Sequence, residues 1–300
     1  MITPTQEYPA LAATLGLPNI FLKREDLHPY GSHKGRSIPP MIKHYLDRGD
    51  RSFAISSSGN AALAAALFFG EIKDDPKIFG SNEKGKLSLD IFVGNNINKE
   101  KLKKIKEAEE KAGHNVRLLA KERPLQALSQ AIEEGSRSLR QSTDDQALVG
   151  YETLAQEIAE LGNVGAVFIG TSSGTTAQAL AQYFKDKKLR IQTHLVQTSS
   201  CHPISADFET YDGPDEQSIA DAIVDSVARR RTKLLPLIKD CSGYSWVATN
   251  EEIERAVELC KTHANLDIST NSALSLVGAT QAAYRGWEIQ GKIVCLVCGQ

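Results

Sequence analysis

The chain lacks a long apolar run, because no stretch approaches the roughly 18 residues of a membrane helix. The N-terminal residues, MITPTQEYPALAATLGLP, lack the basic start and apolar stretch of a secretory signal. The chain also has little net charge, −2 from 35 basic and 37 acidic residues, which argues against a general nucleic-acid-binding role. Its five cysteines show no close repeated spacing, so a disulfide framework is not indicated. We therefore expect a reduced cytoplasmic enzyme or binding protein with no membrane or nucleic-acid partner.

Short apolar runs that end in small polar loops are the main organising pattern. Hydrophobic residues make up 41% and charged residues 24% of the 300 residues, which is ordinary globular usage for one large domain or two smaller ones. Strands are predicted over Phe53 to Ile55, Leu89 to Gly94 and the run AVFI, and each leads into a helical pattern. Apolar spacing further predicts a helix over 125–141. Strands that alternate with helices predict an α/β fold with mostly parallel sheets covered on both faces.

The segment GTSSGTT, Gly170 to Thr176, follows the strand AVFI and opens a predicted helix. Backbone N–H groups at a helix start, together with small hydroxyl side chains, form a site that suits an anion such as phosphate. The segment has neither the Walker lysine nor the G-x-G-x-x-G spacing, so the nucleotide motifs do not apply. A capped turn between strand and helix is the alternative interpretation.

The same segment satisfies G-x-S-x-G, which would place Ser172 on the nucleophile elbow of a serine hydrolase. Acidic and histidine residues follow it in the chain, for example Asp207 and His263. No H-G-G-G oxyanion segment precedes it, and a short pattern of small residues is easily met by chance. The serine hydrolase is kept as an alternative of a different class.

Three further features carry candidate chemistry. In HPYGSHKGRS, Lys34 lies next to His33 and a glycine, either as a turn residue or as a nucleophile. SSSGN, Ser56 to Asn60, has hydroxyl and N–H groups that suit a carboxylate, or it is a second capped turn. In CLVC, residues three apart on a strand point to opposite faces, so we expect no metal site, and Cys298 is of interest because ligands bind at the carboxyl ends of parallel strands.

The arginine run Arg229 to Arg231 has two interpretations. It can contact an anionic substrate group, or it can lie on a solvated helix face. We favour the solvated face, because isolated clusters of charge are common on protein surfaces.

Taken together, GSHKGR, SSSGN, GTSSGT and VCG stand in an order that resembles the fold-type II family of pyridoxal-phosphate enzymes, over nearly the whole chain. FLKREDLHPYGSHKGR looks like the family segment around the cofactor lysine, which implies Lys34 as the Schiff-base and catalytic residue. SSSGN is similar to the loop that holds the substrate carboxylate and the phenolic oxygen of the cofactor. The resemblance implies Asn60 for that oxygen, and Ser57, Ser58 and Gly59 for the substrate.

The resemblance also assigns the remaining contacts of pyridoxal 5'-phosphate. LVCG falls where the family places Ser, Thr or Cys against the pyridine nitrogen, which implies Cys298. A neutral thiol in that position is associated with elimination and replacement chemistry rather than transamination. GTSSGT resembles the family's phosphate loop, which implies as phosphate-binding residues Gly170, Thr171, Ser172, Ser173, Gly174 and Thr175.

Four segments are similar to the threonine-synthase branch in order and spacing: GYETLAQEIAE, VQTSSCHPISADFE, SIADAI and SGYSWVATNEEIERAVELC. The branch usually follows its lysine with an acidic residue and an arginine, whereas here Gly35 lies between Lys34 and Arg36. The resemblance implies β,γ-replacement on O-phosphohomoserine to give threonine. A serine/threonine dehydratase or another β-eliminating enzyme is the near alternative, and a non-catalytic ligand-binding relative is a further one.

The resemblance implies two domains with the cofactor in the cleft between them. We expect a large cofactor-binding domain formed by 1–40 and 147–300, and a small substrate-loop domain over 41–146. We also expect an amino-acid substrate, no metal, and a homodimer.

Overall fold

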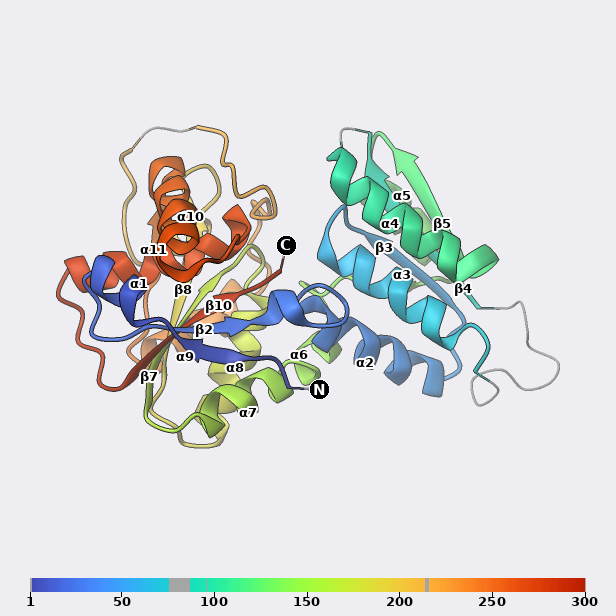
Figure 1. Ribbon diagram of the computed structural model, residues 1–300. Coiled ribbons are helices and arrows are strands. Elements are labelled where there is room, and N and C mark those ends of the chain that lie inside the picture. The colour runs from blue at the N-terminus through green and yellow to red at the C-terminus, as the bar shows by residue number, and fades with distance from the viewer. Residues whose placement is uncertain (1, 76–86, 96, 214–215, 300) are drawn as a thin grey trace. The chain divides into compact units, whose positions relative to one another are not determined.

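The computed structural model describes residues 2–75, 87–95, 97–213 and 216–299 (Figure 1). The chain forms two compact units: unit 1 consists of Met1–His28 and Tyr151–Gln300, and unit 2 of Pro29–Gly150. Each unit is built on a β-sheet that is covered by helices, so the predicted α/β class with mostly parallel sheets is confirmed. No helix in the described ranges has the length and apolar content to cross a membrane.

Unit 1 contains a six-stranded sheet in the order β1-β2-β10-β7-β8-β9. Every neighbouring pair is parallel except β1 with β2 at the edge. The parallel strands are buried on both faces, as expected for continuous apolar runs such as VGAVFIG. The strands are β1 (Thr5–Glu7), β2 (Phe21–Arg24), β7 (Val164–Gly170), β8 (Gln192–Thr198), β9 (Ser245–Ala248) and β10 (Lys292–Val297).

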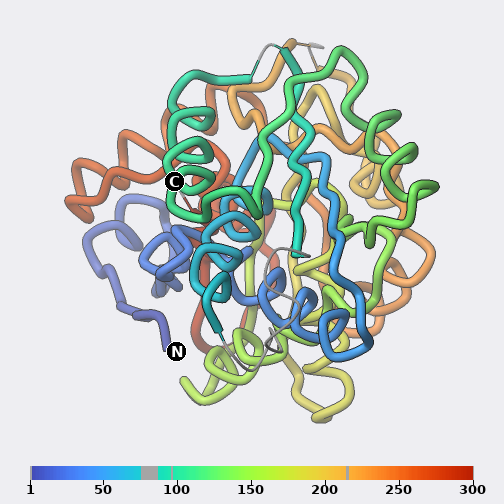
Figure 2. Tube along the Cα trace, turned by 90° about the vertical axis from the view of Figure 1, so that its right-hand side faces the viewer, coloured from blue at the N-terminus to red at the C-terminus, as the bar shows by residue number. Residues whose placement is uncertain are grey.

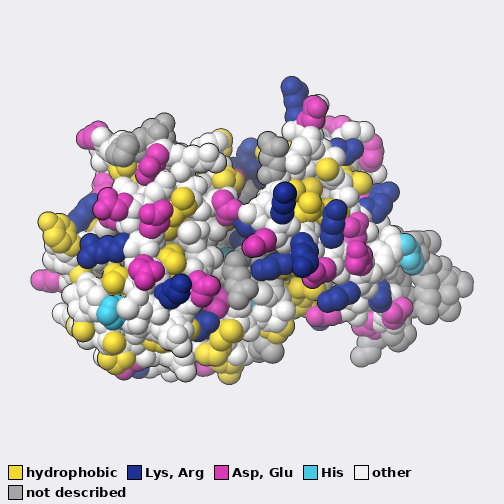
Figure 3. Space-filling view, turned by 45° about the horizontal axis from the view of Figure 1, so that its top comes forward, with side chains coloured by type: hydrophobic (Ala, Val, Ile, Leu, Met, Phe, Trp, Pro, Cys, Tyr) yellow, Lys and Arg dark blue, Asp and Glu magenta, His cyan; other side chains and the backbone are white. Residues whose placement is uncertain are grey.

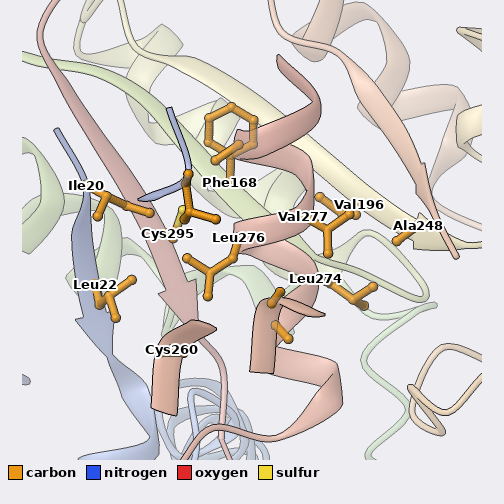
Figure 4. Close-up of a cluster of buried hydrophobic side chains, with 14 of the residues drawn as sticks. Ile20, Leu22, Phe168, Val196, Ala248, Cys260, Leu274, Leu276, Val277 and Cys295 are labelled. Atoms are coloured by element: carbon orange, nitrogen blue, oxygen red, sulfur yellow. The ribbon is translucent and has the colours of Figure 1, made fainter. Parts of the chain in front are cut away.

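Helices cover both faces of this sheet. One layer comprises α1 (Pro9–Thr14), α10 (Asn250–Ala264) and α11 (Thr270–Tyr284), and the other α7 (Glu152–Glu160), α8 (Thr175–Asp186) and α9 (Arg231–Asp240) (Figure 1). Short 3₁₀ turns are η1 (Glu25–Leu27) and η3 (Ser205–Asp207). A capping box begins α10: Thr249 Oγ1 accepts from Glu252 N, and the Glu252 carboxylate accepts from Thr249 N. The core between α11 and the sheet includes Phe168, Leu276 and Cys295 (Figure 4).

Unit 2 contains a four-stranded parallel sheet in the order β5-β4-β3-β6. In Figure 2 the blue trace of β3 runs beside the teal trace of β4, with which it pairs. Its strands are β3 (Ser52–Ser56), β4 (Ser88–Gly94), β5 (Val116–Lys121) and β6 (Arg137–Ser138). Its helices are α2 (Lys34–Asp47), α3 (Asn60–Ile72), α4 (Lys99–Ala112), α5 (Pro124–Glu133) and α6 (Gln146–Val149), with the 3₁₀ turn η2 (Gly113–Asn115).

The predicted helix over 125–141 is too long. Helix α5 ends at Glu133, and Gly135 then adopts a φ of +100°, a left-handed conformation that ends helices. Leu139, directly after β6, is fully buried and belongs to a different cluster of buried apolar residues from Leu128 of α5. The helical spacing of apolar residues therefore continued by chance past Gly135, where the helix has already ended.

The start of α2 groups with unit 2, because α2 packs against α3 and α6. Residues 29–40 and 147–150 therefore belong to the compact unit 2. The sequence analysis expected both segments in the large domain. The predicted domain bounds, 1–40 with 147–300 and 41–146, stay a prediction.

Basic and acidic side chains are interspersed on the face shown in Figure 3. This mixture fits the formal net charge of −2. Helix α4 carries lysine and glutamate residues that are mostly exposed.

Candidate functional site

Two of the predicted site segments meet at the carboxyl edge of the sheet in unit 1. Strand β10 pairs in parallel with β7, and Cys295 lies opposite Phe168. Cys298 is three residues beyond Cys295, and Thr171 is three residues beyond Phe168. Cys298 and the segment that begins at Gly170 therefore leave adjacent strands at the same edge, where parallel sheets bind ligands.

The loop between β7 and α8 is held by its own hydroxyl groups and by a neighbouring segment. Thr171 Oγ1 accepts a hydrogen bond of 3.1 Å from Gly174 N. Ser172 Oγ accepts from the backbone N–H groups of Val224, at 3.1 Å, and Asp225, at 2.9 Å. The loop is thus fixed in position before any ligand binds.

Gly174 is required by this loop. Its φ is +83°, and a Cβ atom there would lie 2.6 Å from Leu234 Cδ2. Gly170 is also confined, because a Cβ would lie 2.8 Å from the carbonyl oxygen of Asn271. Both glycines therefore allow the close packing that sets the loop's shape.

Gln197, near the end of β8, supports this loop, and no motif in the sequence indicated that role. Its side chain is fully buried. Its amide nitrogen donates to the carbonyl oxygen of Ser172 at 3.2 Å, and its amide oxygen accepts from the N–H groups of Ile204, at 2.8 Å, and Ser205, at 3.0 Å. The only sequence signal was a glutamine inside an apolar strand.

Arg230 contacts the first turn of α8. Its side chain is 3% exposed. Its Nε donates to Thr175 Oγ1 at 3.1 Å, and a terminal guanidinium nitrogen donates to Gln178 Oε1 at 3.1 Å. A buried guanidinium therefore touches the last residue of the predicted phosphate loop.

The favoured interpretation of the arginine run as a solvated face is wrong for Arg230. Arg229 and Arg231 are exposed, and Arg231 forms a bidentate ion pair with Asp207. Helix α9 begins at Arg231, and Arg230 is its N-cap residue, directed inward. Helical position, rather than composition, separates the buried arginine from its neighbours.

The residues of the hydrolase alternative do not come together. Ser172 Oγ accepts from backbone N–H groups, Asp207 pairs with Arg231, and His263 is exposed in the last turn of α10. Within the described part of the chain, Ser172 is bonded to neither Asp207 nor His263. A serine nucleophile needs a base within hydrogen-bond reach.

Cys298 follows β10 and is 7% exposed. The next residue is held in place, because the carbonyl oxygen of Gly299 accepts from Ser269 Oγ at 2.7 Å and from Ser272 Oγ at 2.8 Å. Both serines lie at the start of α11, where Ser269 is the N-cap residue. They are further supporting residues that no motif in the sequence indicated.

The other cysteine of CLVC belongs to the core. Cys295 is fully buried, its thiol donates to the carbonyl oxygen of Ser275 at 3.4 Å, and burial raises its pKa (Figure 4). The described residues contain no group of three His, Cys, Asp or Glu side chains arranged to hold a metal ion.

Lys34 is the first residue of α2 in unit 2. Gly31, three residues before it, adopts a φ of +72°, and the backbone N–H of Lys34 donates to Ser32 Oγ at 3.3 Å. Pro39 in the following turn lacks an N–H group, so it cannot bond the carbonyl of Gly35 as a helix normally would. The Lys34 side chain is half-buried, and among the described residues its ammonium group makes no hydrogen bond.

Lys23 offers a contrast, since it is almost completely buried. Its ammonium group donates to the carbonyl oxygen of Thr3 at 2.7 Å and forms an ion pair with Glu157 at 2.5 Å. Lys23, the lysine of FLKRED, therefore forms these contacts within unit 1 and has a structural role.

The loop SSSGN connects β3 to α3 in unit 2. The backbone N–H of Ser57 donates to Phe92 O at 3.2 Å, and Ser57 Oγ accepts from Gly59 N at 3.3 Å. Asn60 begins α3 and is half-buried, whereas Ser58 is exposed. A Cβ atom on Gly59 would meet nothing within 4 Å, so open space lies beside this loop.

Comparison with known proteins identifies the family. The family model described as pyridoxal-phosphate dependent enzyme matches residues 2–299. Threonine synthase of Methanocaldococcus jannaschii is 24% identical over 99% of this chain and 74% of that protein. Threonine synthase of Mycobacterium leprae is 26% identical over 99% of this chain and 80% of that protein. A serine dehydratase-like protein of Rattus norvegicus is 26% identical over 99% of this chain and 89% of that protein.

Solved structures share the fold. A pyridoxal 5'-phosphate-dependent aspartate racemase superimposes with a TM-score of 0.79 at 19% identity, covering 100% of this chain and 90% of that one. Maize serine racemase gives a TM-score of 0.79 at 18% identity, covering 99% of this chain and 87% of that one. At these identities the likeness establishes the fold alone.

Proposed function

Since this chain belongs to the pyridoxal-phosphate-dependent enzyme family, we propose that it is a lyase or synthase acting on an amino acid, with threonine-synthase-like β,γ-replacement on O-phosphohomoserine. Membership of the family confirms the predicted cofactor, pyridoxal 5'-phosphate. One observation carries the finer proposal: a loop of small residues and the cysteine Cys298 leave adjacent parallel strands at one edge of unit 1. The similarity to two threonine synthases, over 99% of this chain and 74% and 80% of those proteins, supports it.

The residues at this edge fit the cofactor. The loop combines a helix start, hydroxyl side chains and the nearby guanidinium of Arg230, all of which suit a phosphate. Cys298, held through the residue after it, is small enough and suitably polar to contact a ring nitrogen. We propose that the phosphate is bound by Gly170, Thr171, Ser172, Ser173, Gly174 and Thr175.

In unit 2 we propose that Lys34 Nζ forms the covalent bond to the cofactor. An amine without a hydrogen-bonding partner among the described residues is available for this bond, unlike Lys23. Bound pyridoxal phosphate supplies an electron sink for a carbanion at the substrate α-carbon. When it is not bound to the cofactor, Lys34 Nζ would move the proton at that carbon.

In this proposal the loop SSSGN binds the substrate. Asn60 would contact the phenolic oxygen of the cofactor, and Ser57, Ser58 and Gly59 would bind the substrate carboxylate. The open space beside Gly59 and the exposure of Ser58 fit such a role. Ser57 Oγ already accepts a bond within the loop and still has its own hydrogen to donate.

A serine/threonine dehydratase is the second candidate. The serine dehydratase-like protein of Rattus norvegicus favours it, because that protein matches 99% of this chain at the same 26% identity as one of the threonine synthases. The hydrolase alternative is set aside, because Ser172 has neither predicted partner and the family is pyridoxal-phosphate dependent.

Assays of purified, cofactor-loaded protein test the choice between these reactions. O-phosphohomoserine is expected to yield threonine and inorganic phosphate. Release of 2-oxo acid and ammonia from serine or threonine, without phosphate release from O-phosphohomoserine, would instead support the dehydratase. A change of substrate chirality with neither product would overturn both proposals.

A further inference from the structure

Gln197 ties the loop between β7 and α8 to the end of the neighbouring strand, and chemistry fixes the orientation of its amide. Its Oε1 lies 2.8 Å from the backbone nitrogen of Ile204 and 3.0 Å from that of Ser205. A backbone N–H group only donates, so the amide atom that faces these two groups is the oxygen. The amide nitrogen therefore faces the carbonyl oxygen of Ser172, at 3.2 Å, and donates to it. Because Gln197 is fully buried, bulk water does not compete for these bonds.

The bond from Gln197 sets the direction of the next N–H group in the loop. The carbonyl of Ser172 and the N–H of Ser173 belong to one peptide unit, and this unit is trans. In a trans peptide the C=O and N–H groups point in opposite directions. The carbonyl points to Gln197, so the N–H of Ser173 points away from it. The hydroxyl of Ser172, which accepts from the N–H groups of Val224 and Asp225, holds the loop at a second point.

The N–H groups of this loop differ in whether the protein itself uses them. That of Thr171 donates to the carbonyl oxygen of Val196 at 2.9 Å, and that of Gly174 donates to Thr171 Oγ1 at 3.1 Å. The N–H of Ser173 has no hydrogen-bond acceptor within the part of the chain that the structure describes. Ser173 is half-buried and comes just before Gly174, the N-cap residue of α8. A donor that is fixed in direction and not used by the chain suits an anion.

We propose that Gln197 is a positioning residue for the cofactor phosphate: by holding the carbonyl of Ser172, it directs the N–H of Ser173 to a phosphate oxygen. Gln197 acts through the peptide unit and does not itself touch the phosphate. The inference rests on the proposed binding of phosphate at 170–175. The ligand chemistry is that of a phosphate monoester, which O-phosphohomoserine shares with the cofactor, so the experiment must separate these two sources.

The first measurement compares the affinity for pyridoxal phosphate with that for pyridoxal, which lacks the phosphate, by absorbance titration without substrate. In Gln197→Met the side chain keeps a similar length but cannot donate, so the peptide unit of Ser172 and Ser173 is no longer held. The preference for pyridoxal phosphate is expected to fall on the order of tenfold, as for the loss of one hydrogen bond to a charged group. The affinity for pyridoxal is expected to be nearly unchanged.

Gln192→Met is the matched control, because Gln192 carries an amide at the other end of the same strand, β8. Its Nε2 donates to the carbonyl oxygen of Glu288 at 2.9 Å, so the substitution removes a bond of the same kind. The wild-type preference is expected to be kept in this variant. A purely structural role of Gln197 would weaken the binding of both ligands by the same factor, or of neither, and either result overturns the inference.

A second measurement reads the N–H group directly and needs no variant. In NMR spectra of protein with isotope-labelled serine, the amide proton of Ser173 is expected to move downfield when pyridoxal phosphate binds, because a charge-assisted hydrogen bond deshields it. Pyridoxal is expected to move it much less, and in folded Gln197→Met the response to pyridoxal phosphate is expected to be smaller. If Gln197→Met fails to fold, the wild-type spectra still test the inference, since an unshifted Ser173 amide overturns it.

The two measurements together separate the sources and the premises. A Ser173 shift that is absent with pyridoxal phosphate and appears only when O-phosphohomoserine is added would assign the N–H to the substrate phosphate and overturn the assignment to the cofactor. If the wild-type protein itself does not prefer pyridoxal phosphate over pyridoxal, the proposed phosphate loop fails and the inference fails with it. If wild type and folded Gln197→Met show the same preference, only the inference fails.

Discussion

Ser272 donates a hydrogen bond of 2.8 Å to the carbonyl oxygen of Gly299 and so fixes the chain directly after Cys298. The backbone N–H of Gly299 approaches the same hydroxyl at 3.4 Å. Ser272 is fully buried in the first turn of α11, a helix packed on β7 and β10. The position of the Cys298 thiol is therefore set by a helix as well as by the strand that carries it.

The role of Cys298 gives a first prediction. Cys298→Ser keeps a small neutral hydrogen-bonding group and is expected to retain much of the activity. Cys298→Asp adds a negative charge that favours a protonated pyridine ring, so the native reaction is expected to fall by at least about tenfold with some transamination. The measurement is product analysis on soluble, cofactor-loaded protein, with Cys201→Ser as a control.

The competing explanation treats Cys298 as a small buried apolar residue. In that case Cys298→Ala would be harmless, and Cys298→Asp would unfold the protein rather than change its products. A folded Cys298→Asp protein with the native products at the native rate would show that the thiol does not contact the ring.

Lys34→Ala is expected to abolish turnover and the absorbance of the covalently bound cofactor while leaving the fold intact. The residue is half-buried at a helix start, so its removal leaves no large cavity. Lys43→Ala, an exposed position on the same helix, is the matched control. Borohydride reduction followed by peptide mapping locates the modified lysine, and a pyridoxyl group on any other lysine would refute the assignment.

Ser172→Ala separates a loop residue from a nucleophile. Loss of the hydroxyl leaves the N–H groups of Val224 and Asp225 without this acceptor, which is expected to cost about 1 kcal/mol of unfolding free energy. Cofactor affinity is expected to weaken only modestly, because backbone N–H groups carry much of the phosphate binding. Urea unfolding and cofactor titration measure both effects. Loss of an esterase activity in this variant would revive the hydrolase alternative.

Gly150 is predicted to be intolerant of a side chain. A Cβ atom there would lie 1.9 Å from the carbonyl oxygen of Arg36 and 2.8 Å from the Cα atom of Ser37, both backbone atoms of α2. Gly150→Ala is therefore expected to lower the unfolding free energy by about 1–3 kcal/mol or more and to displace the start of α2.

Gly70→Ala is the matched control for that change. Gly70 lies inside α3, and its added Cβ would meet Ala112 at an ordinary 3.7 Å. The substitution is expected to be neutral or slightly stabilising, because alanine is the better helix former. Equal stability of Gly150→Ala and Gly70→Ala in urea unfolding would contradict the close approach at Arg36.

The buried His194 is expected to make the folded protein less stable in mild acid. Burial lowers its pKa to about 3, its ring stacks on Phe168 with centroids 4.4 Å apart, and its Nδ1 accepts from Trp246 Nε1 at 3.3 Å. The folded pKa lies below the unfolded value near 6.5, so the folded state binds fewer protons between these values. The stabilisation is complete above pH 6.5 and is lost as pH falls toward 3.

The expected loss over that range is on the order of a few kcal/mol. Urea unfolding between pH 7.5 and 4.5 measures the part of this loss that falls within that interval, and His194→Phe is expected to flatten the pH dependence. His263→Gln, at an exposed histidine, is expected to leave the dependence as in wild type. A pH profile of His194→Phe identical to that of wild type would exclude His194 as the cause.

The sequence by itself determined the local structure and the family. Apolar runs bounded by small residues predicted β3 and β4 to within one residue, because a strand buried on both faces must be continuously apolar. The order of four short motifs also indicated the pyridoxal-phosphate enzymes, which the family model confirms. The overlong helix at 125–141 shows the limit, because spacing does not register a left-handed glycine at 135.

Only the tertiary structure decided which distant segments meet. The pairing of β10 with β7 brings Cys298 to the edge where Gly170 begins its loop, and strand order depends on packing across the whole unit. The tertiary structure also distinguished Arg230 from Arg231, which are neighbouring residues of the same type. One is buried against Thr175 and the other is exposed beside Asp207, because successive residues at a helix start point in different directions.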